Sequence, residues 1–513
     1  MKSLSVKNFR SIVDSGEIKL KPISIFLGKN SCGKSSFMRL LPLLKQTLES
    51  DVNEPLLWYG DYVDFGDFKN ILPIDTVKDE IEVKFDLQIS PYSDFFLEER
   101  NEVFEVNVGL KIAEKYIKEL EIDYFDQKVV VFFHEKKTIE KIIINDASFI
   151  FEKNEFVWEK NKNVMIPTVY EKSFPKQYAM SMMYYYYYHH ERSPEGFLKD
   201  AIYNIFKIFA GDKMKDESKA KFFHDISAIQ SRKNLFTRLI RQKSFKSISQ
   251  YFKERDIQDE TFLRLNNLIV FNQLNFLIEG INSKLNEIFE NTYYLKPIRV
   301  NAERYYRVQG ITINKVDADG SNLPMIFYNM SEKMKGQFKE WCIEKFGLFF
   351  SVETSEGHVS LIVQDLQGNK SNLVDTGYGY SQVLPIIVQL WLLKNNHGKL
   401  QKNKKNHKEI LLVIEQPELH LHPAFQSKLI EVFTALIQEM QEVNIAFKIV
   451  FETHSDTMIN KLGTLINQGV FNKELVNVIL VEKTDKVSTF TQVGYNDDGF
   501  IEHWPIGFMS AGY

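Results

Sequence analysis

The stretch GKNSCGKSS, Gly28 to Ser36, determines how the rest of the chain is interpreted. An apolar run, ISIFL, precedes it, and a segment with helical spacing, FMRLLPLLKQTL, follows it. Two glycines separated by four residues, followed by Lys-Ser between a strand and a helix, are the pattern of a phosphate-binding loop. Gly28 and Gly33 permit backbone angles that point successive N–H groups at phosphate oxygens. The sequence therefore predicts a site for a nucleoside triphosphate.

The residues of this loop have separate expected tasks. Lys34 places a positive charge on the β- and γ-phosphates, and the Ser35 hydroxyl can ligate Mg²⁺. The helix N-terminus adds partial positive charge. Cys32 is interpreted as a small filler inside the loop. We expect the whole loop to contact ATP: Gly28, Lys29, Asn30, Ser31, Cys32, Gly33, Lys34, Ser35 and Ser36.

The bulk composition is that of an ordinary globular protein. With 513 residues, 44% of them apolar and 26% charged, two or three structural units are expected. No stretch approaches the ~20 apolar residues of a membrane span, and the start MKSLSVKNFRSI lacks an apolar signal region, so we expect a cytoplasmic protein without membrane contact. Two cysteines argue against a disulfide framework or a structural zinc site. A net charge of −4 excludes a globally basic nucleic-acid binder but permits a local basic patch.

Hydrophobic periodicity divides the chain into three ranges. Residues 1–95 contain alternating strands, the phosphate loop and its helix. Within 96–290, alternation with period two predicts an antiparallel meander up to about residue 160, and helical spacing follows from about 194. Residues 291–513 return to buried strands followed by helices. The predicted fold class is α/β: a P-loop ATPase head with an antiparallel β lobe and a mainly helical insertion.

Three later motifs supply partners for the phosphate loop. ILLVIEQPE is an apolar strand that ends in Glu415, where Mg²⁺-bound water is held in such folds. Gly377 and Gly379 lead into Ser381-Gln382, a helix N-terminus able to hold a phosphate. His454 ends another strand and can sense or hydrogen-bond a γ-phosphate. A strand-end charge, an ordinary helix cap and a satisfied loop histidine are the respective alternatives.

Several other clusters of polar or aromatic residues can be interpreted either as functional or as structural. Tyr184 to Tyr188 could stack on bases, although an aromatic strand or a packed linker is favoured. His420 and His422 in ELHLHP are a weak metal pattern because no cysteine or carboxylate framework accompanies them. A basic run in the helical range is either a solvated face or a phosphate-backbone contact: Arg232, Lys233, Arg238, Arg241, Lys243, Lys246 and Lys253. A second run, from Lys399 to Lys408, is interpreted as a loop.

The order of these motifs resembles that of the ABC-type ATPases of the OLD/RecF/SMC group. The phosphate loop, an inserted lobe, GYGYSQVLP, LLVIEQPELHLHP and FETHSD follow one another in the same order as in that group. The chain looks most like stand-alone bacterial ATPases that end in a WPxGF-like motif, a kind that occurs in antiphage systems such as Septu, retron-associated ATPase–nuclease pairs and PARIS. The match covers roughly residues 1–90 and 290–513.

The resemblance implies a role for each matching residue. Gly28 to Ser36 would be Walker A, and Glu415 the Walker B acid that binds Mg²⁺ together with Ser35. Gly379, Ser381 and Gln382 would belong to the signature that caps a partner subunit's nucleotide. His454 would be the switch histidine, with Asp456 near the dimer seam. ATP would then lie between two heads, so a homodimer or higher homo-oligomer is expected.

Two positions depart from the pattern of that group. Many relatives carry a catalytic carboxylate directly after the Walker B acid, but this chain has Gln416. Glutamine can orient water but cannot accept its proton, and Glu418 is the nearest substitute base, so slow hydrolysis is expected. The glutamine of the Q-loop cannot be placed, with Gln46 and Gln88 as candidates. The Toprim nuclease of OLD proteins is not expected, since Glu482 is followed by Lys483 instead of glycine.

These observations predict an ATP-driven molecular switch that controls a separate effector, a nuclease or toxin, in bacterial antiphage defence. A RecF- or SMC-like DNA-maintenance ATPase is the main alternative and would use the basic run from Arg232 to Lys253. A nucleotide-gated scaffold with slow turnover, suggested by Gln416, is another. A transporter motor is least favoured because the inserted lobe is far larger than such motors carry.

Overall fold

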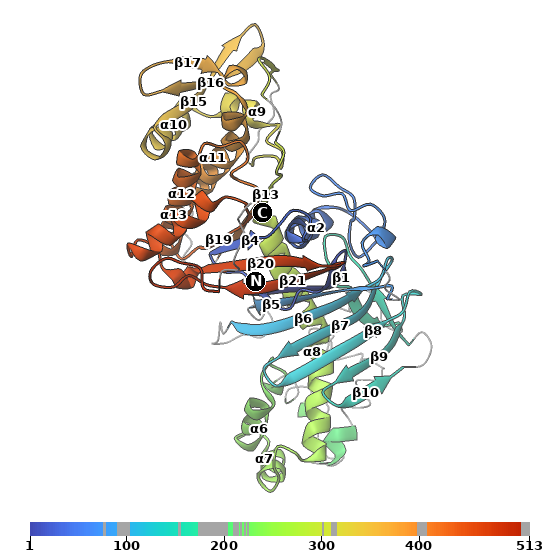
Figure 1. Ribbon diagram of the computed structural model, residues 1–513. Coiled ribbons are helices and arrows are strands. Elements are labelled where there is room, and N and C mark those ends of the chain that lie inside the picture. Colours follow the sequence, from blue (N-terminus) through green and yellow to red (C-terminus); the bar gives the residue numbers. More distant parts are fainter. Residues whose placement is uncertain are drawn as a thin grey trace. The chain divides into compact units, whose positions relative to one another are not determined.

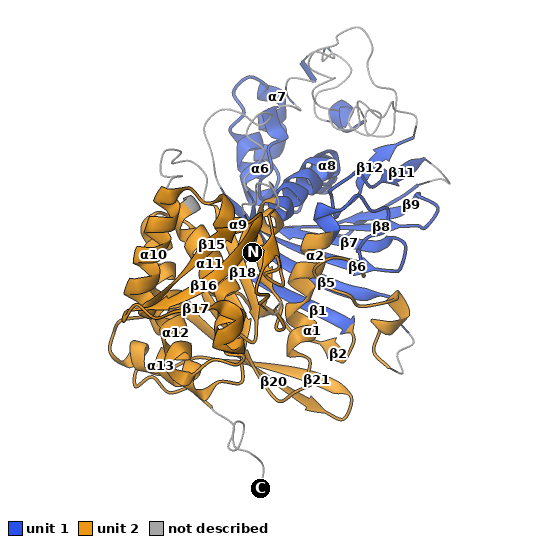
Figure 2. Ribbon diagram, turned by 90° about the horizontal axis from the view of Figure 1, so that it is seen from above, with its two compact units in different colours: residues 1–8, 47–57, 76–286 blue, residues 9–46, 58–75, 287–513 orange. Residues whose placement is uncertain are grey.

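A computed structural model describes residues 1–74, 78–89, 103–151, 155–172, 204–208, 215, 218–219, 222, 225–299, 302–308, 315–397 and 408–503. Within these, the chain forms two compact units: residues 1–8, 47–57 and 76–286, and residues 9–46, 58–75 and 287–513 (Figure 2). Tyr184–Tyr188, the run from Lys399 to Lys405 and the WPIGF segment lie outside the described residues.

The first unit is built on an antiparallel sheet whose strands follow one another in the order β10-β9-β8-β7-β6-β5-β1. From β5 to β10 each strand pairs with its neighbour along the chain, which confirms the predicted meander, and β1 pairs with β5 (Figure 1). Burial alternates along β5, so one face of the strand is covered and the other is wetter. The bounds are β1 Ser3–Phe9, β5 Ile81–Ile89, β6 Phe104–Ile112, β7 Ile117–Tyr124, β8 Gln127–Phe133, β9 Ile139–Ile144 and β10 Ala147–Ile150.

A long helix, α8 (Glu260–Glu290), packs on this unit together with a hairpin of β11 (Phe156–Glu159) and β12 (Thr168–Glu171). Two shorter helices, α6 (Arg232–Ile240) and α7 (Lys246–Lys253), pack together through buried residues that include Leu235, Leu239, Ile248 and Phe252. The helical periodicity predicted after residue 194 is therefore seen in the described part of that range.

The polar face of α8 is held by asparagine side chains. Asn282 accepts from the Met165 and Ile166 amides at 3.2 and 2.9 Å and donates to the Ile166 carbonyl at 2.8 Å. Asn275 makes the same paired contact with both backbone groups of Val169. Further along, Asn266 exchanges hydrogen bonds with the Gln127 side chain. Asn275 and Asn282 thus satisfy backbone groups of the segment from Met165 to Val169, and Asn266 satisfies a buried side-chain amide.

The second unit contains a sheet in the order β13-β18-β19-β4-β20-β21, parallel except for β21. Its strands β4, β18 and β19 are almost continuous apolar runs because both faces are covered. The strands of this sheet are β4 Ile23–Leu27, β13 Thr292–Leu295, β18 Glu409–Glu415, β19 Ala446–Glu452, β20 Val476–Thr484 and β21 Val487–Val493. The helices that accompany it are α1 Lys34–Met38, α2 Leu40–Glu49, α11 Tyr378–His397, α12 Pro423–Glu442 and α13 Asp456–Asn467. Two short strands, β2 Ile12–Asp14 and β3 Ile18–Lys19, pair with β1 instead.

A smaller sheet of β14, β15, β16 and β17 belongs to the same unit, with α9 and α10 beside it (Figure 1). One hydrophobic core runs through β4, β18, β19, α10, α11, α12 and α13. The bounds are α9 Leu323–Asn329, α10 Glu332–Phe346, β14 Tyr306–Arg307, β15 Leu348–Ser355, β16 His358–Asp365 and β17 Lys370–Asn372, with short 3₁₀ turns at Phe68–Asn70, Leu373–Thr376 and Lys473–Leu475. The predicted fold class, an α/β P-loop head with an antiparallel β lobe, is confirmed. The three predicted domain ranges remain a prediction.

Candidate functional site: the carboxyl edge of the parallel sheet

The phosphate loop leaves β4 and enters α1 in the predicted way. Lys34, the first residue of α1, is buried, and its ammonium group donates to the carbonyls of Gly28 and Lys29 at 2.9 and 2.8 Å. Lys29, Asn30 and Ser31 lie exposed at the loop's outer face. The Lys34 charge is thus held under a loop whose backbone faces solvent, where it can exchange carbonyl oxygens for phosphate oxygens.

Both loop glycines are required by close packing. A Cβ at Gly28 would lie 2.2 Å from the Val481 carbonyl oxygen and 2.7 Å from Cys32 Sγ. At Gly33, where φ is +109°, a Cβ would lie 2.5 Å from the Ser488 hydroxyl. Cys32 is buried, in keeping with its interpretation as a filler. Strands β20 and β21 therefore pack so closely behind the loop that only glycine fits.

Glu452, the last residue of β19, contacts the loop directly. The Ser35 hydroxyl lies 2.7 and 3.0 Å from the two carboxylate oxygens of Glu452. Burial, and after it the negative charge of Glu415, raise the pKa of Glu452 to about 7. A second acid therefore shares the site with the predicted one.

Glu415 ends β18 and is fully buried. Arg39 donates to its two oxygens from Nε and Nη2, both at 2.7 Å, and the Tyr294 hydroxyl donates to Oε1 at 2.6 Å. This two-point ion pair raises the pKa of Arg39, and burial with the Glu415 charge raises the pKa of Tyr294. The Glu415 carboxylate is thereby fixed between Arg39, which caps the end of α1, and Tyr294 of β13.

The elbow after β18 joins the end of β19. Gln416 adopts a left-handed conformation, φ +45°, and its N–H donates to the Glu452 carbonyl at 3.2 Å. Glu418 accepts from the His454 N–H at 2.8 Å, and burial raises the pKa of Glu418. Burial, and next the Lys34 charge, lower the pKa of His454, which favours the neutral form of its ring. The predicted residues Gln416, Glu418 and His454 thus lie at one sheet edge.

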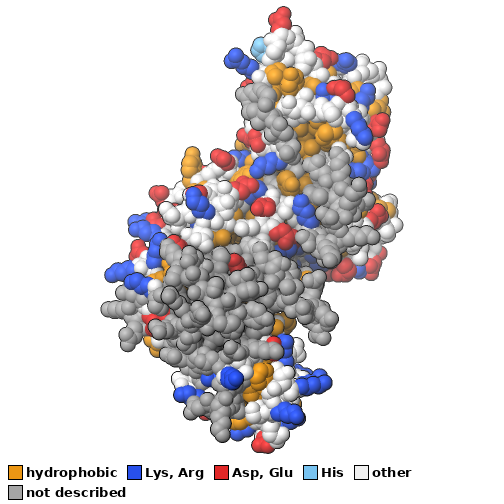
Figure 3. Space-filling model, turned by 180° about the vertical axis from the view of Figure 1, so that it is seen from behind, with side chains coloured by type: hydrophobic (Ala, Val, Ile, Leu, Met, Phe, Trp, Pro, Cys, Tyr) orange, Lys and Arg blue, Asp and Glu red, His pale blue; other side chains and the backbone are white. Residues whose placement is uncertain are grey.

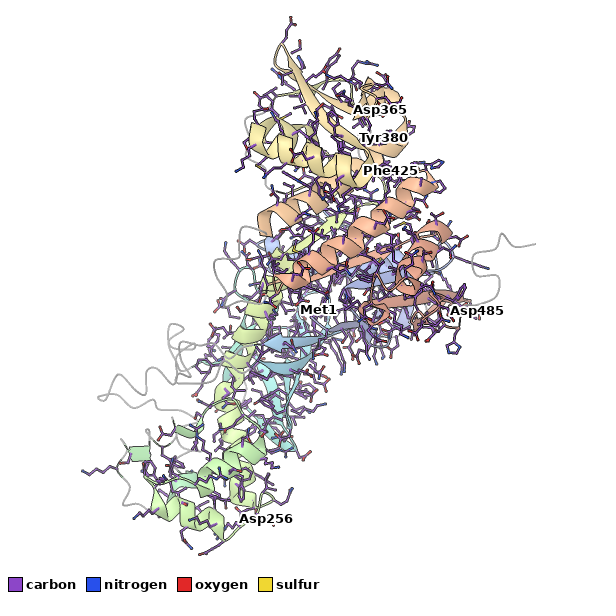
Figure 4. The ribbon with its side chains drawn as sticks, turned by 90° about the vertical axis from the view of Figure 1, so that its left-hand side faces the viewer. Met1, Asp256, Asp365, Tyr380, Phe425 and Asp485 are labelled. Carbon is purple, nitrogen blue, oxygen red and sulfur yellow. The ribbon has the colours of Figure 1, made fainter. Side chains whose placement is uncertain are left out.

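The start of α11 contacts the same elbow from another direction. A Cβ at Gly379 would lie 2.9 Å from the His420 carbonyl oxygen. Ser381 donates to the Tyr378 carbonyl, while Gln382 exchanges hydrogen bonds with the Arg299 backbone at 3.0 and 3.1 Å. Tyr380 packs against Phe425 of α12 with ring centroids 6.1 Å apart (Figure 4).

Arg299 connects this helix start to the strand that carries Glu415. Its guanidinium, 1% exposed, donates to the Gln382 carbonyl at 3.2 Å and to the Glu415 carbonyl at 3.1 Å. Burial lowers the pKa of Arg299 to about 10. A buried arginine held by two backbone carbonyls is a rigid link, because moving either carbonyl leaves a desolvated charge without its partner.

Several predicted residues have structural contacts. His422 caps α12 by accepting from the Ala424 N–H at 3.2 Å, and within the described residues no three His, Cys, Asp or Glu side chains gather to hold a metal. Gln46 binds the backbone of Val63, so its side chain supports the loop beneath Gly60. Asp456 is the first residue of α13, whose cap is Ser455.

Sequence reasoning missed Glu452, Arg39, Tyr294 and Arg299. Glu452 carried a usable signal, since it ends the buried run IVFE just as Glu415 ends LLVIE. Parallel strands that end in the same residue type bring those residues together when their registers match, and Glu415 is paired with Glu452. Arg39 carried no such signal because its partner is 376 positions away.

A phosphate loop, acids at neighbouring strand ends and a histidine at the next turn define a P-loop ATPase head. Residues 1–459 match the family model described as AAA ATPase domain, so the chain belongs to that family. The prediction of an ATPase is confirmed at this level. No helix among the described residues is long and apolar enough to cross a membrane.

Searches gave no match among curated proteins. Among solved structures, the chain is similar to the SMC head domain from Thermotoga maritima, with 10% identity, a TM-score of 0.32 and coverage of 96% of this chain and 97% of that one. It is also similar to an Smc head domain with an extended coiled coil, bound to the C-terminal domain of ScpA and derived from Pyrococcus furiosus. That match has 11% identity, a TM-score of 0.33 and 96% coverage of both chains. TM-scores this low transfer no detail to this chain.

Replacing Gly33 with alanine tests the packing behind the loop. We expect Gly33→Ala to abolish nucleotide binding and to lower the melting temperature, because the new methyl group meets Ser488. Gly16→Ala is the matched control: its φ is +63° but no atom lies within 4 Å of the added Cβ, so it should cost only the ~1–2 kcal/mol of the left-handed conformation. Equal effects of the two variants on binding would contradict the packing argument.

Proposed function

We propose that this ATPase is a molecular switch in which bound ATP controls the assembly of two or more heads. The observation that carries the proposal is the convergence of Lys34, Ser35, two strand-end acids and His454 at one sheet edge. Lys34 would hold the β- and γ-phosphates of ATP. Ser35, together with a strand-end acid, would hold Mg²⁺, which neutralises phosphate charge when bound. Neutral His454 would donate to or accept from the γ-phosphate region.

Assembly would use the start of α11. In this proposal Gly379, Ser381 and Gln382 cap the nucleotide of a partner subunit, and Asp456 lies near the seam between the subunits. Tyr378, the first residue of α11, is 61% exposed and is available to a second copy of the chain. Arg299 supports coupling between cap and site, because one guanidinium contacts both Gln382 and the strand end of Glu415.

The output of the switch would be a separate effector protein. A nuclease or toxin in bacterial antiphage defence is the candidate, with the ATPase located in the cytoplasm. Support for this part comes from the order of the sequence motifs and from their resemblance to ATPases of such systems. It is independent of the geometry of the nucleotide site.

The Lys34→Ala variant tests the switch. Loss of the ammonium group should reduce ATP turnover to background and abolish any increase in native mass on adding ATP and Mg²⁺, since Lys34 supplies the positive charge that lies directly under the loop. Turnover and native mass spectra of both proteins, in one buffer, measure the two effects. Lys333→Ala, a change of an exposed lysine on α10, is the control. Turnover that survives Lys34→Ala would refute the proposal.

The proposal also includes slow ATP hydrolysis, which rests on the presence of Gln416. Its amide can orient water but takes no proton, and half-buried Glu418 is already bonded to the His454 N–H. Gln416→Glu has the same shape and should raise turnover by about 10²-fold or more, as expected for adding a general base. Single-turnover kinetics with excess enzyme would measure it. An unchanged rate would show that the residue at position 416 does not limit the rate of the hydrolysis step.

Binding of DNA is a second candidate function. Lys233 and Arg238 on α6, Lys246 on α7, and Arg241 and Lys243 in the connection between these helices are exposed, while Arg232 is engaged by Asp126. Figure 3 shows Lys and Arg side chains gathered at that end of the first unit. Such a cluster is what a phosphate backbone attracts.

A double charge reversal tests this candidate. Arg241→Glu with Lys243→Glu should weaken duplex DNA binding and flatten the plot of log affinity against log salt by about 0.9 per lost phosphate contact. Fluorescence anisotropy over a salt series provides the slope. Lys333→Glu with Lys370→Glu, on exposed sites of the second unit, should leave both quantities unchanged. Equal affinities for all three proteins would remove this candidate.

A further inference from the structure

Either of two buried acids could hold Mg²⁺ at the nucleotide site. Glu415 and Glu452 end neighbouring parallel strands, face each other in register and are 0% and 2% exposed. Both lie beside α1, which carries the Ser35 hydroxyl. In P-loop sites a strand-end acid acts together with that hydroxyl in holding Mg²⁺. The sequence pattern alone favours Glu415, so the contacts of the two carboxylates must decide.

The Glu415 carboxylate is already paired with a cation, Arg39. Oε1 accepts from Arg39 Nε and from the Tyr294 hydroxyl, and Oε2 accepts from Arg39 Nη2. Two of these three bonds come from one cation in the two-point geometry that guanidinium and carboxylate favour. Turning Glu415 toward a metal would break a partly buried ion pair and leave Arg39 without its acid, which is costly.

Glu452 has the opposite surroundings. Its two oxygens lie within hydrogen-bond distance of one neutral group, the Ser35 hydroxyl, and no ion pair to Glu452 is found among the described residues. Ser35 donates its single proton to this carboxylate, so the lone pairs of the hydroxyl oxygen remain for a cation. Lys34 and Arg39 lie near enough to favour the charged form of Glu452, but neither pairs with it directly, so a bound positive ion would stabilise this buried carboxylate further.

We propose that Glu452, with Ser35, is the acid that holds Mg²⁺ at this site, and that Glu415 is a positioning residue that anchors Arg39 and Tyr294. Mg²⁺ typically takes one or two protein groups and fills its other positions with phosphate oxygens and water, so one serine and one carboxylate suffice. The assignment rests on the proposed nucleotide function of the same loop. It assigns the metal-binding carboxylate to the end of β19, whereas the sequence pattern assigns it to the end of β18.

Nucleotide affinity with and without metal tests the assignment. A fluorescent ATP analogue that is not hydrolysed is titrated onto wild type, Glu452→Gln and Glu415→Gln, first in EDTA and then in Mg²⁺. Glu452→Gln should lose about 10–100-fold of the affinity gained from Mg²⁺, the usual cost of disturbing a metal's protein partners, while its affinity in EDTA stays at the wild-type value. Glu415→Gln should keep the Mg²⁺ gain but melt at a lower temperature, because it weakens the Arg39 ion pair.

Titration of Mn²⁺ by electron paramagnetic resonance, with the analogue present, gives a second readout that needs no turnover. Glu452→Asp keeps the charge on a shorter arm and should bind Mn²⁺ with intermediate affinity, which also covers the case in which Glu452→Gln fails to fold. The assignment is overturned if the affinity gained from Mg²⁺ is lost in Glu415→Gln and kept in Glu452→Gln. It is also overturned if both variants keep the full gain in affinity. A wild type that binds no analogue in either buffer refutes the nucleotide function instead.

Discussion

The register between β18 and β19 is the constraint on which the site depends. It sets two buried glutamates side by side, an arrangement that like charges resist unless each has a partner. Arg39 and Tyr294 compensate one of them, and Ser35 contacts the other. Because Ser35 lies in the first turn of α1 and Arg39 caps the end of that helix, the same contacts that relieve the repulsion also fix α1 against the sheet. Loop, helix and two strand ends therefore have one shared geometry.

Arg299 extends this arrangement to the helix start that carries Ser381. It is among the largest fully buried side chains, and its hydrogen bonds to the protein go to the carbonyls of Gln382 and Glu415. Neither carbonyl neutralises a full charge, and Glu418 and Glu415 supply the nearby negative potential. The position of α11 is in this way coupled to the charge state of the sheet edge. A ligand that changes the charge at that edge would change the electrostatic potential at the Arg299 guanidinium.

The predictable parts were those encoded locally. The phosphate loop follows from nine consecutive residues, and the meander follows from period-two alternation, so neither needs knowledge of distant neighbours. The partners of Glu415 are different in kind. Arg39 and Tyr294 come within reach only after β13, β18, β19 and β4 have paired, and no local pattern specifies that order. Glu452 lies between these cases: the strand that it ends was predictable, but its position opposite Glu415 required the register.

The asparagines of α8 have a consequence for how the first unit responds to its surroundings. Asn266, Asn275 and Asn282 hold the helix through amides, which neither gain nor lose protons in the physiological range and carry no net charge. Acidification and added salt act on ionised groups, so they have little effect on this attachment. The second unit depends on carboxylates and a guanidinium at its sheet edge. A change in pH would therefore act on the nucleotide-site edge, where burial raises the pKa of Glu452 to about 7, while the asparagine contacts of α8 contain no group that titrates.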